Sequence, residues 1–468
     1  MNNNCPYAAN GCGGCSGIML CYEDTVRRKE KEFRQLFPEA LPMIAAESPL
    51  HYRNKVIRTF YGKKKELHAG IYRAGSHFVI PVHDCLLENR GADRITGTAT
   101  ELLAETGLSA YDEDTGKGLL RHIMIRRAHK TGETLVTVVT GHEQFPGGRE
   151  FAEKLMRKCT DVKGVIQNIN ERGDSAVLGF REKILGGKDE IRDEMCGLKV
   201  QLKYRSFYQV NTAQAEIVYK TAVDAAGLSG KENVLDAYCG VGLIGMLAAG
   251  KAGRVDGIEI VKPAVICAGK SAVENGIKNI RFICGDAAKA LAEDKGNYHT
   301  VFADPPRAGL SPLFLKSLIQ SEPEKIVYIS CNPETLHRDL KELNQGGYRT
   351  ETVQPVDMFP YTEHVETVAL LSKGEIDSKR IRVEFPLDNM DIAAFREKAT
   401  YPQIKNYVLE NTGLKVSSLY ISQIKRKCGL DVSDSYNKPK SEDSRVPQCP
   451  PEKEEAIIDA LKHFGMIS

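Results

Sequence analysis

Short apolar runs alternate with longer amphipathic stretches from about residue 197 to residue 374. The runs are rich in β-branched and aromatic residues and end at glycine, proline or an acid, which is typical of buried strands. We expect strands at 233–236, 254–259, 280–284, 300–303, 326–329 and 367–371, with helices that include 214–228, 243–249 and 263–276. This alternation predicts an α/β domain with a parallel, doubly wound, Rossmann-like sheet.

A different pattern occupies residues 49–187, where short strands are broken by glycine and charge. Strands at 55–61, 70–73, 122–126 and 134–140 predict a mainly β or α+β module. Within it, residues 52–65 interleave aromatic side chains with cations, which suits a surface that stacks RNA bases and neutralises phosphates. A solvated hairpin whose lysines protect an edge strand explains the same pattern. The residues concerned are Tyr52, Arg53, Asn54, Lys55, Arg58, Phe60, Tyr61, Lys63, Lys64 and Lys65.

Both ends of the chain have helical patterns. A basic helix is predicted for residues 23–37, and helices at 402–411 and 417–427 resemble a helix-turn-helix in outline. A polar linker at 437–451 precedes a last amphipathic helix, 451–464. We therefore divide the chain into a cysteine loop with its helix (1–47), a central β-rich domain (48–190), the α/β domain (191–374) and a C-terminal helical extension (375–468).

Composition narrows the classes of function. The 468 residues are 42% hydrophobic and 27% charged, which fits a multidomain globular protein. The net charge of +2 excludes a uniformly basic nucleic-acid binder, so any such surface must be local. No apolar run approaches the ~20 residues that a membrane span needs. Thirteen cysteines favour a reducing, cytoplasmic location and metal-binding or catalytic use over disulfides.

Three cysteines gather near the N-terminus: Cys5, Cys12 and Cys15, the last two separated by a pair of glycines. Glycine lets the backbone fold round a metal, and thiolates suit zinc or an iron–sulfur cluster. The fourth ligand is open at this stage. Cys21 is nearest in sequence, whereas Cys85 lies at the end of a strand-like run.

Glycines and acids cluster where the strands of the α/β domain end. Three glycines and the acid after the second strand match a dinucleotide fingerprint, which makes a nicotinamide oxidoreductase a candidate. Further acids after the third and fourth strands, the latter in an Asp-Pro-Pro-Arg turn, favour S-adenosylmethionine. The glycines are Gly240, Gly242 and Gly245, and the acids are Glu259, Asp286 and Asp304.

A cysteine follows the fifth strand. Pro333 ends the ladder after Cys331, and the carboxyl ends of strands are where ligands bind in open α/β sheets. Cys331 is therefore presented at the lip of a site, although a free cysteine is also commonly a small core residue. Glu366 lies at the start of the strand 367–371 and can face the same cleft, or can be a surface acid.

Six motifs, in order, resemble those of the RNA uracil-5-methyltransferase family, and most closely its 23S ribosomal RNA members with an iron–sulfur cluster. The resemblance spans about residues 5–372. Only four residues precede Cys5, so we expect no RNA-binding β-barrel of the kind that several relatives carry there, and Leu243 stands where relatives often have a polar residue. The motifs are Cys5-x6-Cys12-Gly-Gly-Cys15, Ser206-Phe-Tyr-Gln-Val-Asn211, Asp236-Ala-Tyr-Cys-Gly-Val-Gly242, Asp304-Pro-Pro-Arg307, Ser330-Cys-Asn-Pro333 and Asp357-Met-Phe-Pro360 with His364-Val-Glu366.

The resemblance implies roles for individual residues. Cys331 would be the nucleophile and Glu366 the base, in an S-adenosylmethionine-dependent methyltransferase domain that follows an iron–sulfur and β-rich RNA-binding region. Gln209, Tyr238, Glu259, Asp286 and Asp304, with the glycines Gly240 and Gly242, would line the S-adenosylmethionine site. Cys5, Cys12, Cys15 and Cys85 would hold a 4Fe–4S cluster, which favours Cys85 over Cys21.

The implied activity is 5-methyluridine formation in 23S ribosomal RNA through a covalent bond between Cys331 and carbon 6 of a flipped-out uracil. Transfer RNA is the alternative substrate. A non-methylating iron–sulfur protein that binds RNA or carries electrons is the second alternative, and an amino-group methyltransferase would have no use for Cys331. The expected partner is 23S ribosomal RNA, naked or partly assembled, with no membrane and no obligate protein partner.

Overall fold

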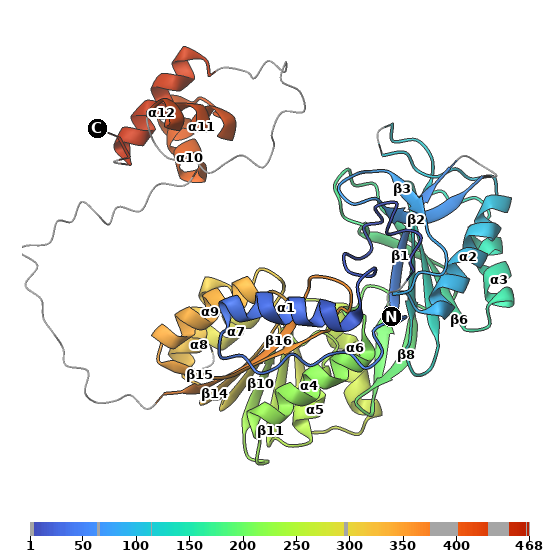
Figure 1. The fold of residues 1–468 in the computed structure, drawn as a ribbon, viewed down its shortest axis with the longest axis horizontal. Helices are drawn as coiled ribbons and strands as arrows, with labels where there is room; N and C mark the ends of the chain where they lie inside the picture. Colours follow the sequence, from blue (N-terminus) through green and yellow to red (C-terminus); the bar gives the residue numbers. More distant parts are fainter. Residues whose placement is uncertain are drawn as a thin grey trace, which may run out of the picture. The chain divides into compact units, whose positions relative to one another are not determined.

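The computed structural model describes residues 4–62, 66–113, 115–293, 298–374, 401–428, 449–464 and 466–467. The chain divides into two compact units, Met1–Ile376 and Asp377–Ser468, whose elements are labelled in Figure 1. Within the described ranges, no helix combines the length and the apolar character needed to cross a membrane.

The α/β domain of the first unit contains a seven-stranded sheet in the order β12-β11-β10-β13-β14-β16-β15. The predicted strands are confirmed, but the sheet is mixed, because β16 runs antiparallel to both β14 and β15. A short loop can join β15 to β16, since antiparallel strands need no crossover helix. The strands are β10 (Asn233–Ala237), β11 (Arg254–Glu259), β12 (Ile280–Cys284), β13 (Thr300–Ala303), β14 (Lys325–Ser330), β15 (Tyr348–Val356) and β16 (Glu366–Lys373).

Helices cover both faces of this sheet. One face packs against α4, α5 and α6, and the other against α7, α8 and α9. The helices are α4 (Thr212–Ala226), α5 (Leu243–Ala249), α6 (Lys262–Glu274), α7 (Ala287–Glu293), α8 (Pro312–Ser321) and α9 (Pro333–Gln345). The doubly wound architecture predicted from the sequence is therefore present.

The central module is a second seven-stranded sheet, in the order β3-β2-β1-β4-β5-β6-β7. One face is covered by two helices that the strand pattern did not predict, α2 (Arg90–Glu105) and α3 (Gly148–Lys158). Its other face shares a core with α4 and with the hairpin of β8 (Glu190–Met195) and β9 (Leu198–Lys203). The strands are β1 (Lys55–Tyr61), β2 (His68–Tyr72), β3 (Val79–Pro81), β4 (Leu120–Arg127), β5 (Thr134–Thr140), β6 (Val162–Ile169) and β7 (Arg181–Gly187).

The proposed RNA-binding stretch 52–65 requires a correction. Tyr52, Asn54, Arg58 and Phe60 are buried, so they cannot form a binding surface. The strand β1 lies between β2 and β4, so it is not an edge strand either. Alternate residues of a central strand point into the packed face, and the Arg58 guanidinium is neutralised there by two carboxylates, those of Glu88 and Asp93. Residues 63–65 lie outside the described part of the chain.

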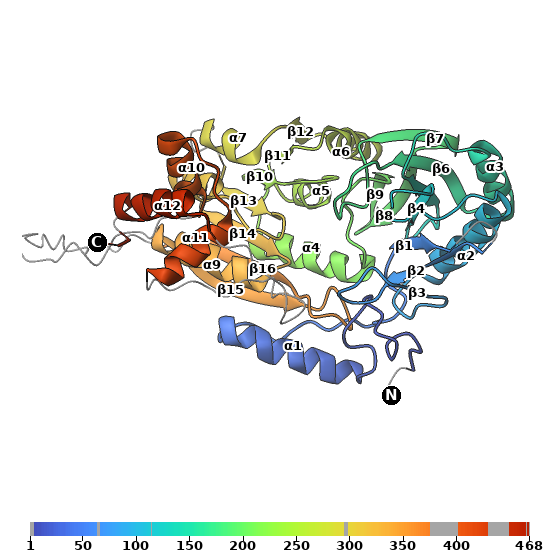
Figure 2. The same cartoon turned by 90° about the horizontal axis from the view of Figure 1, so that it is seen from above.

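Helix α1 (Tyr22–Leu36) lies beside β15 and β16 in both views (Figures 1 and 2). Phe33 and Phe37 belong to the core on the α9 side of the sheet. After the helix, the amides of Leu41 and Ile44 donate to carbonyls of β15 at distances of 3.0 Å each. The N-terminal segment is therefore an integral part of the α/β domain.

In the described part of the second unit, three helices share a core of their own: α10 (Tyr401–Thr412), α11 (Ser418–Lys427) and α12 (Pro451–His463). Ser417 caps α11, because its side chain accepts a hydrogen bond from the Tyr420 amide. Most of the predicted linker, residues 437–448, lies outside the described residues.

Candidate active site

Cys331 and Glu366 come together at the edge of the sheet where the parallel strands end. In the antiparallel pair of β14 and β16, Ser330 lies opposite Thr367. The next position along each strand therefore sets Cys331 opposite Glu366. The Asn332 side chain caps α9 directly afterwards, so the backbone turns away and leaves Cys331 at the lip of the sheet.

Glu366 forms an acidic pair with Asp304, which follows β13. Glu366 is fully buried, and neither oxygen of its carboxyl group has a hydrogen-bond partner among the described residues. Burial raises the pKa of Glu366 well above its ordinary value, and the charge of Asp304 raises it further. Burial also raises the pKa of Asp304, to about 7. Because two neighbouring carboxylates do not both ionise readily, the pair retains a proton near neutral pH.

The same charges act on Cys331. Burial, followed by the charges of Glu366 and Asp304, raises the pKa of the Cys331 thiol to about 11, while the charge of Arg307 opposes the shift. Cys331 opens into a cavity of about 490 Å³ that is walled by α1, Arg307 and residues 363–365. The Arg307 Nη2 atom lies 3.3 Å from Nδ1 of His364 on the rim of this cavity.

A second cavity, of about 580 Å³, lies at the ends of β10, β11 and β12 and is lined by Tyr238, Glu259 and Asp286. The Glu259 carboxylate accepts hydrogen bonds from the amides of Gly240 and Val261, at 3.1 and 2.8 Å. Tyr238, Glu259 and Asp286 are thus brought together as the sequence predicts. An acid at the end of each of two neighbouring strands suits a ligand with hydroxyl and amino donors.

The turn after β10 leaves no room for larger residues. Gly242 has φ of 80°, and a Cβ atom there would lie 2.5 Å from the Phe282 ring. Asp236 is completely buried and accepts a hydrogen bond from the Gly245 amide at 2.8 Å, and burial raises its pKa to about 8. Gln209 is also buried and is not among the residues that line the second cavity.

The four predicted cluster ligands are neighbours. Cys5, Cys15 and Cys85 pack on one small apolar cluster. Burial raises the pKa of the Cys15 thiol to about 11, with further increases from the charges of Cys85, Cys5 and Cys12, against the opposing charge of Arg53. Within the described ranges, however, no group of three His, Cys, Asp or Glu side chains is close enough to hold a metal ion.

Backbone contacts fix the glycine pair of this loop. The Gly13 amide donates to the Tyr72 carbonyl at 3.0 Å, and a Cβ atom on Gly13 would lie 2.9 Å from that oxygen. The thiol of the alternative ligand, Cys21, donates instead to Glu23 at the start of α1.

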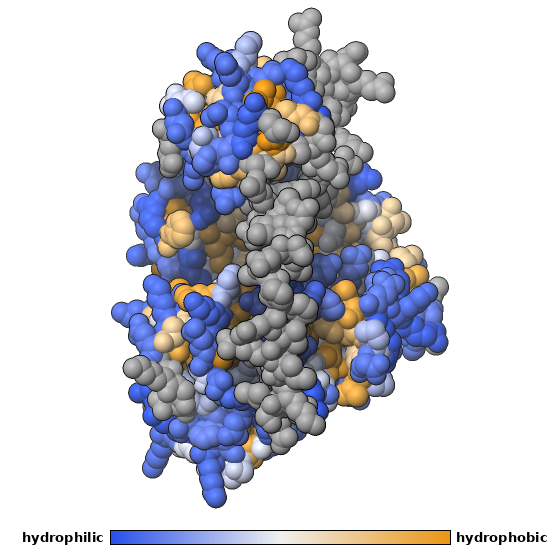
Figure 3. All heavy atoms as spheres, turned by 90° about the vertical axis from the view of Figure 1, so that its left-hand side faces the viewer, coloured by the Kyte–Doolittle hydropathy of each residue, from blue (hydrophilic) through white to orange (hydrophobic). Residues whose placement is uncertain are grey.

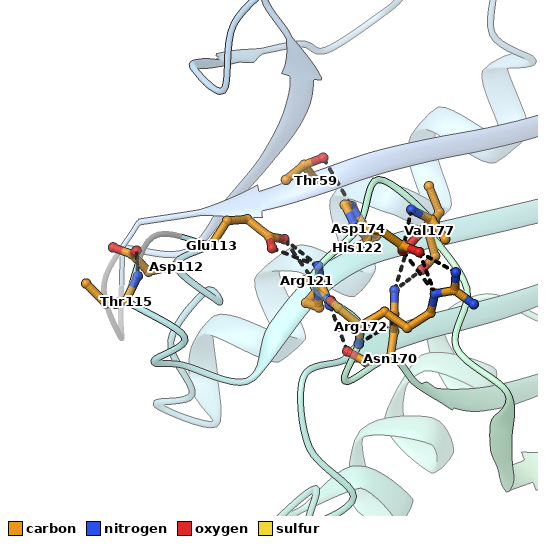
Figure 4. A network of polar contacts seen from close by, with 11 residues as sticks. Thr59, Asp112, Glu113, Thr115, Arg121, His122, Asn170, Arg172, Asp174 and Val177 are labelled. Carbon is orange, nitrogen blue, oxygen red and sulfur yellow. Dashed lines mark hydrogen bonds and ion pairs between the residues drawn. The ribbon is translucent and has the colours of Figure 1, made fainter. Parts of the chain in front are cut away.

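Two exposed phenylalanines, Phe180 of the central module and Phe207 after β9, were missed by sequence reasoning, because burial cannot be read from residue type. Phe180 is 83% exposed and Phe207 is 65% exposed. On the face drawn in Figure 3, apolar groups are scattered among hydrophilic side chains. The buried Arg121 pairs with Glu113 and donates to the backbone of the loop that leads to Phe180 (Figure 4). Arg172 of that loop lies over the Phe180 ring, 5.0 Å from its centroid.

Two buried cations were also missed. Lys29 of α1 is paired with Asp357, a residue 328 positions away in the sequence. Arg126 is 2% exposed, and its Nε and Nη1 atoms have no hydrogen-bond partner among the described residues. Neither could be found from sequence, because both lie in stretches that read as an ordinary amphipathic helix and an ordinary strand.

The sheet order, the glycine turn after β10 and the acids at the strand ends define an α/β methyltransferase. A crystal structure of the Pyrococcus abyssi tRNA (uracil-54, C5)-methyltransferase in complex with S-adenosyl-L-homocysteine has a similar fold. Its TM-score is 0.64 and its identity 26%, and the match covers 77% of this chain and 86% of that one.

The family follows from the sequence comparisons. The sequence model of the tRNA (Uracil-5-)-methyltransferase family matches residues 132–374. An uncharacterized RNA methyltransferase of Caldanaerobacter subterraneus subsp. tengcongensis is 40% identical over 383 residues, which cover 80% of this chain and 84% of the relative. An uncharacterized RNA methyltransferase of Listeria innocua is 39% identical over 371 residues, which cover 77% of this chain and 82% of the relative. The chain belongs to this family of RNA methyltransferases, which confirms the resemblance to the RNA uracil-5-methyltransferase family.

Proposed function

We propose that this chain uses S-adenosylmethionine to methylate carbon 5 of a uridine in 23S ribosomal RNA, with Cys331 as the nucleophile and Glu366 as the base. The observation that carries the proposal is the position of Cys331 opposite Glu366, beside Asp304 and open to a cavity. Carbon 5 of uracil is a poor nucleophile. A thiolate that adds to carbon 6 makes carbon 5 reactive, and sulfur adds reversibly.

The steps use these residues in turn. The Cys331 thiol loses its proton to water in the cavity, and its sulfur bonds to carbon 6, which leaves the electron pair on carbon 5 and its carbonyl. Carbon 5 takes the methyl group, which S-adenosylmethionine supplies from a sulfonium that becomes a neutral thioether. Glu366 then takes the proton from carbon 5, and the bond between sulfur and carbon 6 breaks. Glu366 has the higher pKa of the acidic pair and holds the shared proton at rest, so it must pass that proton to Asp304 or to water before it can act as the base.

The pocket at the ends of β10–β12 is the proposed donor site. Tyr238, Glu259 and Asp286 line it, and the acids would accept hydrogen bonds from the ribose hydroxyls and the adenine amino group. The tight turn at Gly240 and Gly242 keeps the backbone low beside the ligand. Asp304 would lie between this pocket and Cys331.

The four cysteines are the proposed ligands of a 4Fe–4S cluster, because their motif resembles that of the 23S ribosomal RNA members of the family. Four thiols, Cys5, Cys12, Cys15 and Cys85, offer the donor set that such a cluster takes. Arg53 lies beside them and donates to the Gly14 carbonyl at 2.9 Å, so its charge can balance the negative thiolates. The cluster would be structural, because the proposed reaction moves no electrons.

The exposed Phe180 and Phe207, with Arg172 stacked on the former, are the proposed surface for unpaired bases. Ribosomal RNA is favoured as the substrate by the cysteine motif. Transfer RNA is the second candidate, favoured by the similarity to the Pyrococcus abyssi enzyme.

Trapping with 5-fluorouridine tests the chemistry, since fluorine on carbon 5 blocks the last proton abstraction and leaves a covalent adduct. The wild-type protein should form an adduct that survives denaturing electrophoresis, and Cys331→Ala should form none. The exposed Cys284 provides the control, because Cys284→Ala should retain the adduct. Absence of an adduct with the wild-type protein, or its persistence in Cys331→Ala, would refute the mechanism.

The choice of RNA is decided by methyl transfer to purified 23S ribosomal RNA fragments and to transfer RNA under the same conditions. Faster labelling of transfer RNA overturns the ribosomal assignment. For the cysteines, anaerobic purification should give a brown protein with about four irons per chain. A colourless protein with one zinc per chain would refute the cluster.

A further inference from the structure

The backbone around Glu366 has to set the position of this base. The Glu366 carboxyl group makes no hydrogen bond among the described residues, so no side-chain partner orients it. Its backbone opens β16 and lies opposite Val356, the last residue of β15. The segment between them, residues 357–365, is called here the 357–365 loop. The conformation of this loop therefore fixes the position of the Glu366 carboxyl group relative to Cys331.

Helix α1 binds this loop through one buried cation, the ammonium group of Lys29. The Lys29 Nζ atom lies 2.6 Å from Oδ1 of Asp357, and it also donates to the carbonyls of Phe359 at 3.0 Å and His364 at 2.9 Å. An ammonium group has three hydrogens, and all three are directed at the 357–365 loop. Lys29 is 3% exposed and Asp357 is 0% exposed, so water screens the pair very little.

The other oxygen of Asp357 is bound by the same helix. The Tyr22 hydroxyl donates to Asp357 Oδ2 at 2.8 Å and accepts from the Ala46 amide at 2.6 Å. Asp357 also closes its own backbone onto the segment after α1, since its amide donates to the Ile44 carbonyl at 2.9 Å. The N-terminal segment therefore binds both the carboxylate and the backbone amide of Asp357.

The cysteine loop reaches the middle of the 357–365 loop. The amides of Ser16 and Gly17 donate to the Tyr361 carbonyl at 3.2 and 2.9 Å. Tyr361 has φ of 62°, a conformation that a residue with a side chain rarely adopts without such support. The loop is thus braced by a segment more than 300 residues earlier in the chain.

We propose that Lys29 is a positioning residue for Glu366: through Asp357 and the loop carbonyls it holds the 357–365 loop so that the base faces carbon 5 of the substrate. The proposal rests on the proposed function, because it assigns Glu366 the removal of that proton. Lys29 contributes little to donor binding, since it lies outside the pocket lined by Tyr238, Glu259 and Asp286.

The test compares adduct formation with turnover in Lys29→Met. Formation of the 5-fluorouridine adduct needs Cys331 and the donor but not the base. Release of methylated natural RNA needs the base. We expect Lys29→Met to form the fluorinated adduct within about twofold of the wild-type rate, and to lose about 10- to 100-fold in kcat on natural RNA, since a misplaced acid–base group forfeits part of a 10²–10⁴-fold effect.

Two further readouts separate positioning from a general structural role. The covalent adduct with natural RNA should accumulate in Lys29→Met, as it should in Glu366→Gln, while the Kd for S-adenosylmethionine stays unchanged. Arg27→Met is the matched control, because it removes a cation from the exposed side of the same helix, where Arg27 pairs with Asp24. It should behave as wild type.

Folding is monitored by thermal melting. If Lys29→Met does not fold, Tyr22→Phe serves instead, because it removes one hydrogen bond to Asp357 and keeps the ion pair. We then expect a smaller fall of kcat on natural RNA, with formation of the fluorinated adduct retained. A parallel fall of adduct formation and turnover in the folded variants, or unchanged turnover, overturns the inference. Absence of an adduct with the wild-type protein overturns the proposed function instead.

Discussion

The reactivity of Cys331 in the free protein offers a test that needs no RNA. Burial and the charges of Glu366 and Asp304 raise the pKa of this thiol from 9.0 to about 11. At pH 7.5 this leaves about 100-fold less thiolate than the ordinary pKa would. The intrinsic nucleophilicity of a thiolate grows with its pKa and recovers about tenfold of this. We expect Cys331 to react with a small aromatic disulfide about tenfold more slowly than an ordinary accessible thiol.

The assay is peptide-resolved mass spectrometry of labelling rates between pH 6.5 and 10, with the exposed Cys284 as the internal reference. The rate at Cys331 should rise with pH through the whole range without a plateau. Because the acidic pair retains a proton near neutral pH, Glu366→Gln should change the rate little at pH 7.5 and should speed the reaction at the alkaline end of the range, where Glu366 ionises. Arg307→Met removes the opposing positive charge and should slow it.

Equal rates at Cys331 and Cys284 at pH 7.5, or a Cys331 rate that levels off below pH 8, would contradict the raised pKa of Cys331. A rate that Glu366→Gln leaves unchanged up to pH 10 would contradict it as well, because the Glu366 charge has the largest of the charge effects on this thiol. A slow, pH-dependent thiol means that the reactive thiolate must be generated after substrates bind. The positive sulfonium of a bound donor would supply a further charge of the required sign, beside that of Arg307.

Three further predictions concern stability and donor binding. Burial lowers the pKa of His122 to about 4, so the unfolded state binds more protons below pH 6.5, and the free energy of unfolding should fall by about 3 kcal/mol as pH drops from 6.5 to 4. Chemical denaturation of wild type and His122→Gln measures this. Arg58→Met leaves the buried Glu88 without its cation, and should lower the unfolding free energy by about 3–5 kcal/mol in the same experiment. Gly242→Ala forces a Cβ atom against the Phe282 ring, and should weaken S-adenosylmethionine binding by more than tenfold in calorimetry.

Each of these has a control on the same chain. His129→Gln, at an exposed position, should leave the pH dependence of unfolding as it is. Arg27→Met breaks an exposed ion pair and should barely change stability. Gly269→Ala places its Cβ atom in open space on α6 and should not affect donor binding. A change in a control as large as in its partner variant would contradict the corresponding prediction.

Local pattern determined most strands and the order of the motifs. The bounds of β1, β5, β11, β12 and β13 agree with the sequence prediction, because these runs are short, β-branched and bounded by turn residues. The same pattern placed Cys331 at the end of β14, and motif spacing predicted the site acids. Hydrophobic periodicity is a local property, so it can be read from short windows of the sequence when the fold is not known.

Tertiary structure decided which charges are buried and what they touch. In the sequence, Arg58 and Lys29 cannot be told apart from the solvated cations around them. In the structure, each is buried against an acid from another part of the chain. The family resemblance named Glu366 as the base, but its position opposite Cys331 depends on the antiparallel pairing of β14 with β16, which a prediction of a wholly parallel sheet does not contain. Burial and long-range pairing arise from how elements pack, and residues 328 positions apart leave no joint signal in a single sequence.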